Sequence, residues 1–110
     1  MSLEKQRCTA CTPETPRIEE AEARHLLAEV PGFALEGEGT RISRTFRFTN
    51  YYETMAFVNA VAFIAHREDH HPDLEVHYRT CKVTYSTHAI SGLSKNDFIC
   101  AAKVNALFST

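Results

Sequence analysis

The chain has 110 residues with a formal net charge of -2 at pH 7, and 44% of its residues are hydrophobic. This length fits a single domain with a modest core. Charges of both signs are intermixed, so we expect no direct nucleic-acid binding. No apolar run approaches the ~18 residues of a membrane-spanning helix, and the start lacks the apolar core of a secretory signal. We therefore expect no membrane partner and a cytoplasmic protein with passive access to the nucleus.

The first part of the chain is polar and contains a C-x-x-C pair, Cys8 and Cys11. We expect residues 1–14 to be a disordered tail and residues 15–110 to form the single domain. One C-x-x-C without a second pair at zinc-ribbon spacing is weak evidence for a metal or redox site. We interpret both residues as reduced thiols of the tail.

Local signals next predict a helix and a hairpin. Residues 15–32 have helical character, with Thr15 as the capping residue and a Pro-Gly pair at the end. Residues 33–50 predict two antiparallel strands that turn at Gly37 and Gly39.

A long central helix is predicted over residues 50–69, with Asn50 as its cap. Its apolar residues form two stripes at helical spacing. The first comprises Tyr51, Met55, Val58, Ala62 and Ala65, and the second comprises Phe57, Val61 and Ile64. Packing on one sheet does not require so wide an apolar face, so we expect this helix also to contact another subunit.

The last third of the chain predicts two strands and a helix. Residues 73–79 and 81–88 alternate apolar and polar side chains, with His77 on the polar face. Ser94 and Asp97 resemble a capping box that opens the last helix. The order α-β-β-α-β-β-α predicts an α+β fold with a four-stranded antiparallel sheet and helices packed on one face.

Histidines cluster where the central helix ends. Residues 65–79 contain four of the six: His66, His70, His71 and His77. Pro72 disfavours helical geometry at His71, so the helix must end just before it, and the rings of His70 and His71 can then face a common pocket. Adjacent imidazoles repel when both are charged, so they titrate as a coupled pair. One charged and one neutral ring suit general acid–base catalysis.

The residues alone leave other interpretations open. The cluster can be a polar connection between helix and strand. His66 and His70 share a helix face, as zinc ligands can, and His88 or Cys81 could complete a metal-dependent site. A hydroxyl nucleophile just before His88 is less favoured, because groups adjacent in sequence rarely form a catalytic triad.

The spacing of the histidines is similar to that of the pterin-4a-carbinolamine dehydratase family. The matching positions are His66, His70, His71, Pro72, Tyr78, His88 and Asp97. The resemblance covers about residues 17–108. The chain departs from the family at His66, which is commonly Glu, and also at Leu74 and Ala89.

This resemblance implies a hydro-lyase that removes water from 4a-hydroxytetrahydropterin, gives quinonoid dihydropterin and so recycles tetrahydrobiopterin. It implies no cofactor and no metal, since the pterin is the substrate. His70 and His88 would be the catalytic acid–base pair, and His71 would chiefly bind and orient the pterin. His66 would modulate the coupled titration of His70 and His71. The implied substrate-binding positions are Asp69, His70, His71, Pro72, Ser86, Thr87, His88 and Ala89.

The resemblance also implies a homodimer or homotetramer, formed through a sheet edge and the central helix at residues 50–69. An alternative function follows from it, because animal members also act as dimerisation cofactors of a transcription factor. We interpret Asp97 as a structural cap of the last helix.

Overall fold

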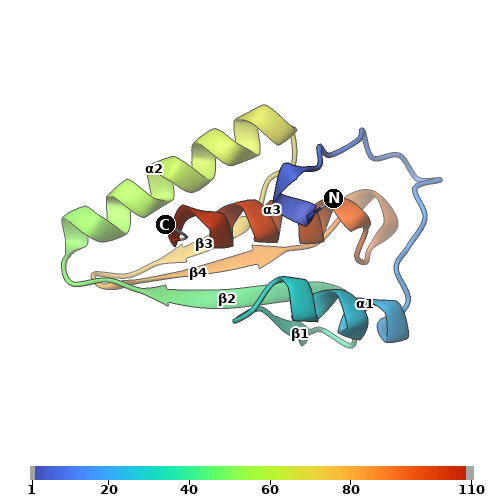
Figure 1. Cartoon of the computed structure of the whole chain (residues 1–110), viewed down its shortest axis with the longest axis horizontal. Helices are drawn as coiled ribbons and strands as arrows, with labels where there is room; N and C mark the ends of the chain where they lie inside the picture. Colours follow the sequence, from blue (N-terminus) through green and yellow to red (C-terminus); the bar gives the residue numbers. More distant parts are fainter. Residues whose placement is uncertain (1, 109–110) are drawn as a thin grey trace.

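The computed structural model describes residues 2–108, which form one sheet and three α-helices (Figure 1). The elements are α1 (Glu20–Leu26), β1 (Ala34–Glu36), β2 (Arg41–Arg47), α2 (Tyr51–Glu68), β3 (Asp73–Val76), β4 (Thr80–Tyr85) and α3 (Lys95–Asn105). Short 3-10 turns are η1 (Leu3–Lys5), η2 (Leu27–Glu29), η3 (His88–Ile90) and η4 (Ala106–Phe108). The predicted order of helices and strands is confirmed.

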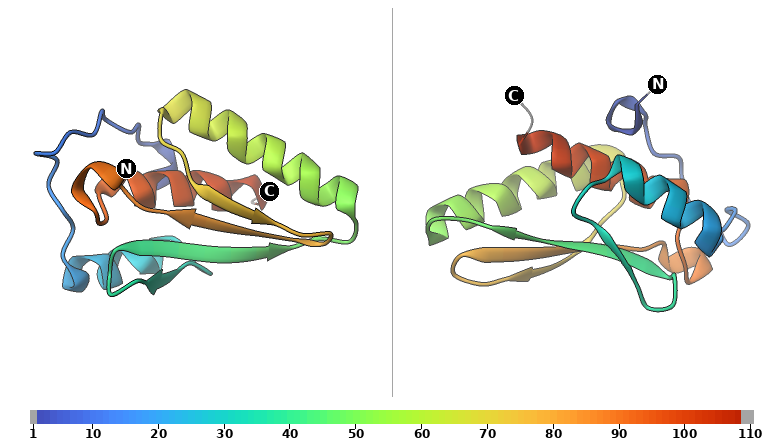
Figure 2. Two further views of the ribbon diagram at one scale, coloured as in Figure 1. Left: turned by 180° about the vertical axis from the view of Figure 1, so that it is seen from behind. Right: turned by 60° about the horizontal axis from the view of Figure 1, so that its bottom comes forward.

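The four strands form one antiparallel sheet in the order β1-β2-β4-β3. The β1–β2 turn uses Gly37 and Gly39 as predicted, because both have positive φ, of 60° and 86°. Along β4, Cys81, Val83 and Tyr85 are fully buried, while the residues between them are half-buried. The three helices cover this buried face of the sheet (Figure 2), which confirms the predicted α+β layers.

Helix α2 begins at its predicted cap, where the Asn50 side chain accepts a hydrogen bond from the Glu53 N–H. The second predicted stripe faces the core: Phe57 and Val61 are buried. The first stripe lies along the flank of the helix, and its Tyr51 is 45% exposed. Part of the apolar surface of α2 therefore stays uncovered by this chain.

Helix α1 begins later than predicted. The sequence placed its cap at Thr15, but the helix starts at Glu20. The reason is tertiary: Ile18 is buried, and its N–H donates to the Leu93 carbonyl oxygen at 2.8 Å. This pairing holds the preceding residues outside the helix, against the local preference of the Thr-Pro pair.

The segment before α1 also differs from the expected disordered tail. Leu3 in η1 is only 4% exposed and belongs to the hydrophobic core, where η1 packs on α3. Cys8 and Thr9 donate backbone hydrogen bonds to the side chains of Glu68 and Asn96. Burial of Leu3 and these polar partners fasten the segment to the domain. Within residues 2–108, no helix has the length and apolar character needed to cross a membrane.

Candidate active site

The site is built where α2 ends. Asp69 caps the helix in the left-handed conformation, with φ of 52°, and its N–H bonds to the Ala65 carbonyl oxygen. The chain then leaves the helix, as Pro72 predicts. His70 turns inward, is only 9% exposed, and lies parallel to the Tyr85 ring with 6.1 Å between ring centroids.

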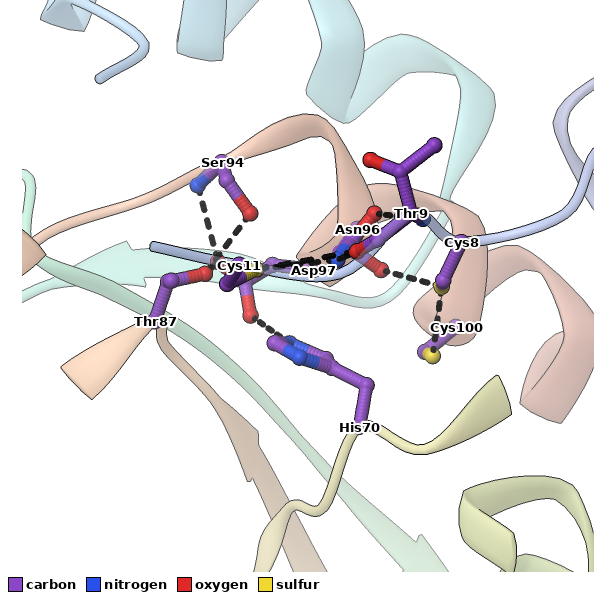
Figure 3. Close-up of polar contacts among 9 residues, drawn as sticks. All are labelled: Cys8, Thr9, Cys11, His70, Thr87, Ser94, Asn96, Asp97 and Cys100. Atoms are coloured by element: carbon purple, nitrogen blue, oxygen red, sulfur yellow. Dashed lines mark hydrogen bonds and ion pairs between the residues drawn. The ribbon is translucent and has the colours of Figure 1, made fainter. Parts of the chain in front are cut away.

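Asp97 at the start of α3 holds His70 in place. Its carboxylate is fully buried, and Oδ1 lies 2.6 Å from His70 Nε2. The other oxygen, Oδ2, accepts from Thr87 Oγ1 at 2.8 Å and from the Ser94 N–H at 2.9 Å. Figure 3 shows this network converging on Asp97 from α3, from the end of β4 and from the end of α2.

This network sets the chemistry of the His70 ring. A carboxylate only accepts hydrogen bonds, so the ring must present Nε2–H to Asp97. Asp97 lies in the first turn of α3, where a carboxylate interacts favourably with the helix dipole. The ring is thereby oriented with Nδ1 as the nitrogen that is left to exchange a proton, which is the arrangement of a general acid or base.

His88 lies in η3, directly after Thr87, and it is exposed with Ala89. Thr87 is 2% exposed, and its hydroxyl also bonds Ser94 Oγ at 2.7 Å. Its backbone N–H donates to the Gly92 carbonyl oxygen. Asp97 thus connects the His88 turn to His70, while the N–H and hydroxyl of Thr87 are used inside the protein.

His71 does not follow His70 into the interior. It lines a pocket of about 380 Å³ whose other walls are Val61, Ala62, Ala65, His66, Pro72 and Leu74. The expectation that both rings face one common pocket therefore needs correction. Successive side chains of a non-helical chain tend to point to opposite sides, so adjacent histidines separate once the helix has ended.

The remaining predicted residues lie around these two places. Asp69 is exposed at the α2 cap, Ser86 is half-buried, and Pro72 is half-buried in the wall of the pocket. His77 is exposed, as its place on the polar face predicted, and its Nε2 lies 3.0 Å from Glu75 Oε2. Within residues 2–108 no three side chains of His, Cys, Asp or Glu are grouped as metal ligands. The alternative set of His66 and His70 with His88 or Cys81 is therefore not assembled.

Next to the site, the end of α2 carries a buried carboxylate. The Glu68 side chain is 3% exposed and lies 3.0 Å from Arg7 and 3.9 Å from Lys103. Burial raises the pKa of this carboxyl, but the Cys8 N–H and the two cations outweigh burial, so its pKa lies below the ordinary value. Glu68 therefore ties the N-terminal segment to the residues that precede His70.

The role of Asp97 as partner of His70 was missed in the sequence. Its capping function is confirmed, because the Ser94–Asp97 capping box forms. The contact with His70 spans 27 positions along the chain, so no local pattern shows it. The available signal was the place of Asp97 at the end of the histidine pattern.

Sequence comparison finds relatives that match over most of the chain. Residues 16–107 match the family described as Pterin 4 alpha carbinolamine dehydratase. A protein of Xanthomonas campestris, whose name assigns it provisionally to pterin-4-alpha-carbinolamine dehydratase, is 57% identical over 106 residues, with 96% of this chain and 90% of the relative covered. A Nitrosomonas europaea protein with the same name is 54% identical, with 98% of this chain and 95% of the relative covered.

Solved structures share the fold. A transcriptional coactivator/pterin dehydratase from Brucella melitensis superimposes with a TM-score of 0.80 at 29% identity, covering 84% of this chain and 98% of that one. A pterin dehydratase-like protein, described as a RuBisCO assembly factor in the alpha-carboxysome, superimposes with a TM-score of 0.62 at 22% identity. The match covers 72% of this chain and 92% of that one. The second likeness concerns the fold alone.

Proposed function

Because the chain belongs to the pterin 4 alpha carbinolamine dehydratase family, we propose that it removes water from 4a-hydroxytetrahydropterin and releases quinonoid dihydropterin, which serves the recycling of tetrahydrobiopterin. The observation that supports this most directly is the buried His70–Asp97 pair, with 2.6 Å between His70 Nε2 and Asp97 Oδ1. Beside it lies a turn that carries another histidine, His88, which is exposed.

The reaction needs one acid and one base. The N5 lone pair of the pterin expels the hydroxyl group from C4a, and the proton on N5 is then lost. The C4a–O bond breaks, the C4a–N5 double bond forms, and the hydroxyl leaves as water after taking up a proton. Histidines suit both proton transfers near neutral pH. No electrons leave the substrate, so this chemistry requires no redox cofactor, and histidines for both proton transfers leave no step that needs a metal.

We assign the two proton transfers to His70 and His88. Asp97 orients His70, and through Thr87 it also anchors the turn that carries His88. His71 binds and orients the pterin from the pocket that it shares with His66 and Pro72. That pocket, of about 380 Å³, lies within the size range of small-molecule sites. Asp69, Ser86 and Ala89 contribute to the edge of the pterin site.

We also propose self-association through α2 and a sheet edge. Tyr52 and Phe63 on α2 are 83% and 61% exposed, and strands β1 and β3 form the two edges of the sheet. Sedimentation of Phe63→Glu beside the wild type tests the helix surface. A lighter species is expected for the variant, and unchanged assembly would remove α2 from the interface.

A second candidate function comes from the Brucella melitensis relative, whose description includes transcriptional coactivator. A purely partner-binding role would not need the His70–Asp97 pair. The variants His70→Ala and Asp97→Asn should therefore leave such partner binding intact. The relatives named above from Xanthomonas and Nitrosomonas are bacterial, which supports a cytoplasmic location and gives no support to a nuclear one.

Histidine variants test the assignments. His70→Ala and His88→Ala should each lower kcat by about 10²- to 10⁴-fold, the usual effect of losing an acid or base. His71→Ala should raise KM more than it lowers kcat. His77→Ala, at an exposed position directly after β3, is the matched control and should keep wild-type rates. Wild-type rates in all of the site variants would show that the reaction takes place elsewhere.

A further inference from the structure

Two cysteines far apart in the sequence meet beside the site. Cys8 of the N-terminal segment and Cys100 of α3 bring their Sγ atoms within 3.5 Å (Figure 3). Cys8 is half-buried, whereas Cys100 is fully buried. The second cysteine of the C-x-x-C pair takes a different partner, since Cys11 Sγ accepts from Asn96 Nδ2 at 3.0 Å. The spatial pair is therefore Cys8 with Cys100, and not the pair that the motif suggests.

The backbone around Cys8 is held in register for this contact. The Cys8 N–H donates to Glu68 Oε1 at 2.8 Å. Thr9 makes two hydrogen bonds with the Asn96 side chain, from its N–H at 3.1 Å and to its carbonyl oxygen at 2.7 Å. These bonds fix Cys8 against α3 before any covalent link exists.

We propose that Cys8 and Cys100 form a reversible disulfide when the protein meets a mild peroxide oxidant, and that this bond fastens the N-terminal segment to α3. The sulfurs must approach by only about 1.5 Å, because a disulfide bond is ~2.05 Å long. The proposal is independent of the dehydratase activity.

The oxidation has two steps and needs hydrogen peroxide as the co-reactant. The Cys8 thiol gives up its proton and the thiolate attacks one peroxide oxygen. The O–O bond breaks, Cys8 becomes a sulfenic acid, and the departing hydroxide takes up the released proton to give water. Cys100 sulfur then attacks the Cys8 sulfur, the S–O bond breaks, and the proton of Cys100 leaves with the hydroxyl as a second water. Two thiols are oxidised by two electrons, and one peroxide is reduced to two waters.

The environment separates the roles of the two thiols. Contact with Cys8, together with burial, raises the pKa of the Cys100 thiol above its ordinary value. Burial also shields Cys100 from peroxide, which leaves the partly exposed Cys8 as the first site of attack. Cys100 acts as the resolving thiol in the second step.

The bond would join α3, which carries Asp97, to the N-terminal segment, which contacts the end of α2. Cys100 follows Asp97 by one helical turn, and Cys8 is bonded to Glu68, which lies just before His70. Because the link closes a loop of more than ninety residues, it should restrict the unfolded chain strongly. The oxidised protein should therefore melt about 5 °C or more above the reduced protein.

The test treats the reduced full-length protein with one equivalent of hydrogen peroxide. Intact mass should fall by two hydrogen atoms, and a non-reducing peptide map should show Cys8 linked to Cys100. The rise in melting temperature should disappear on addition of dithiothreitol. Cys11→Ser is the matched control and should keep both the link and the rise.

Cys8→Ser should lose the link and the rise in melting temperature. Cys8 is only half-buried, so its replacement should leave the fold intact, whereas replacing the fully buried Cys100 could prevent folding. A Cys8–Cys11 link, a disulfide between two copies of the chain, or peroxide consumption with both thiols still free would overturn the proposal.

Discussion

Replacing Asp97 by Asn changes the hydrogen bonding of His70 with little change in side-chain shape. The Asn carbonyl oxygen can take the place of Oδ2 and keep the bonds from Thr87 and the Ser94 N–H. The amide NH₂ group then faces His70 Nε2, where the carboxylate oxygen now lies at 2.6 Å. Because the amide donates, Nε2 must become the acceptor, and the ring proton moves to Nδ1.

The expected effect is therefore larger on activity than on stability. Presenting the wrong tautomer should lower kcat by about 10²- to 10⁴-fold. Asp97→Asn exchanges three charge-assisted hydrogen bonds for neutral ones and should cost about 1–3 kcal/mol of unfolding free energy. Asp97→Ala leaves His70 Nε2–H and the Ser94 N–H without their acceptor in a buried site and should cost about 3–5 kcal/mol.

The assay combines steady-state kinetics, urea unfolding and ¹⁵N NMR of the imidazole nitrogens. Asp73→Asn, on the exposed side of β3, is the control and should behave as the wild type. The NMR spectrum of Asp97→Asn should show the proton of His70 shifted from Nε2 to Nδ1. A variant with the altered tautomer and wild-type kcat would refute the argument that Asp97 positions His70 for catalysis.

Three further predictions concern other parts of the molecule. Folding lowers the pKa of the Glu68 carboxyl from about 4.5, so its stabilising effect is present above that pH and is lost as the pH falls through the pKa of the folded protein. Glu68→Gln should therefore reduce the fall in melting temperature that acid causes. The buried Tyr85 hydroxyl is the one buried side-chain polar atom of residues 2–108 without a hydrogen-bond partner, so Tyr85→Phe should raise the unfolding free energy by about 1 kcal/mol in urea titration, and a loss of stability would contradict this. His66→Glu should shift the pH–rate profile through the pocket it shares with His71, with little loss of maximal rate, whereas a collapse in kcat would show that His66 acts directly.

Local rules predicted the strands, the α2 cap and the end of α2 because neighbouring residues decide these features. Asn50 caps its own helix, and Pro72 restricts the residue before it. The start of α1 was predicted wrongly because a distant partner, the Leu93 carbonyl oxygen, holds Ile18 outside the helix. Local propensity does not include such long-range bonds.

The sequence offers residues for the candidate site, whereas the geometry of the site depends on contacts between distant segments. The cluster at the end of α2 identified His70, but the direction of its ring depends on Asp97, which is brought near only by the packing of α3. The separation of His70 from His71 likewise depends on where the chain turns after Asp69. The contact of Cys8 with Cys100 requires the N-terminal segment to pack, and its polar composition predicted the opposite.

The most direct test of the proposed function is the rate at which 4a-hydroxytetrahydropterin disappears, with the substrate generated in place by an aromatic amino-acid hydroxylase. The chelator-treated wild type and His88→Ala are compared at mildly alkaline pH with a reaction that lacks the protein. We expect the wild type to accelerate the loss of water and His88→Ala to do so far less. No acceleration by the wild type would contradict the proposed dehydratase activity.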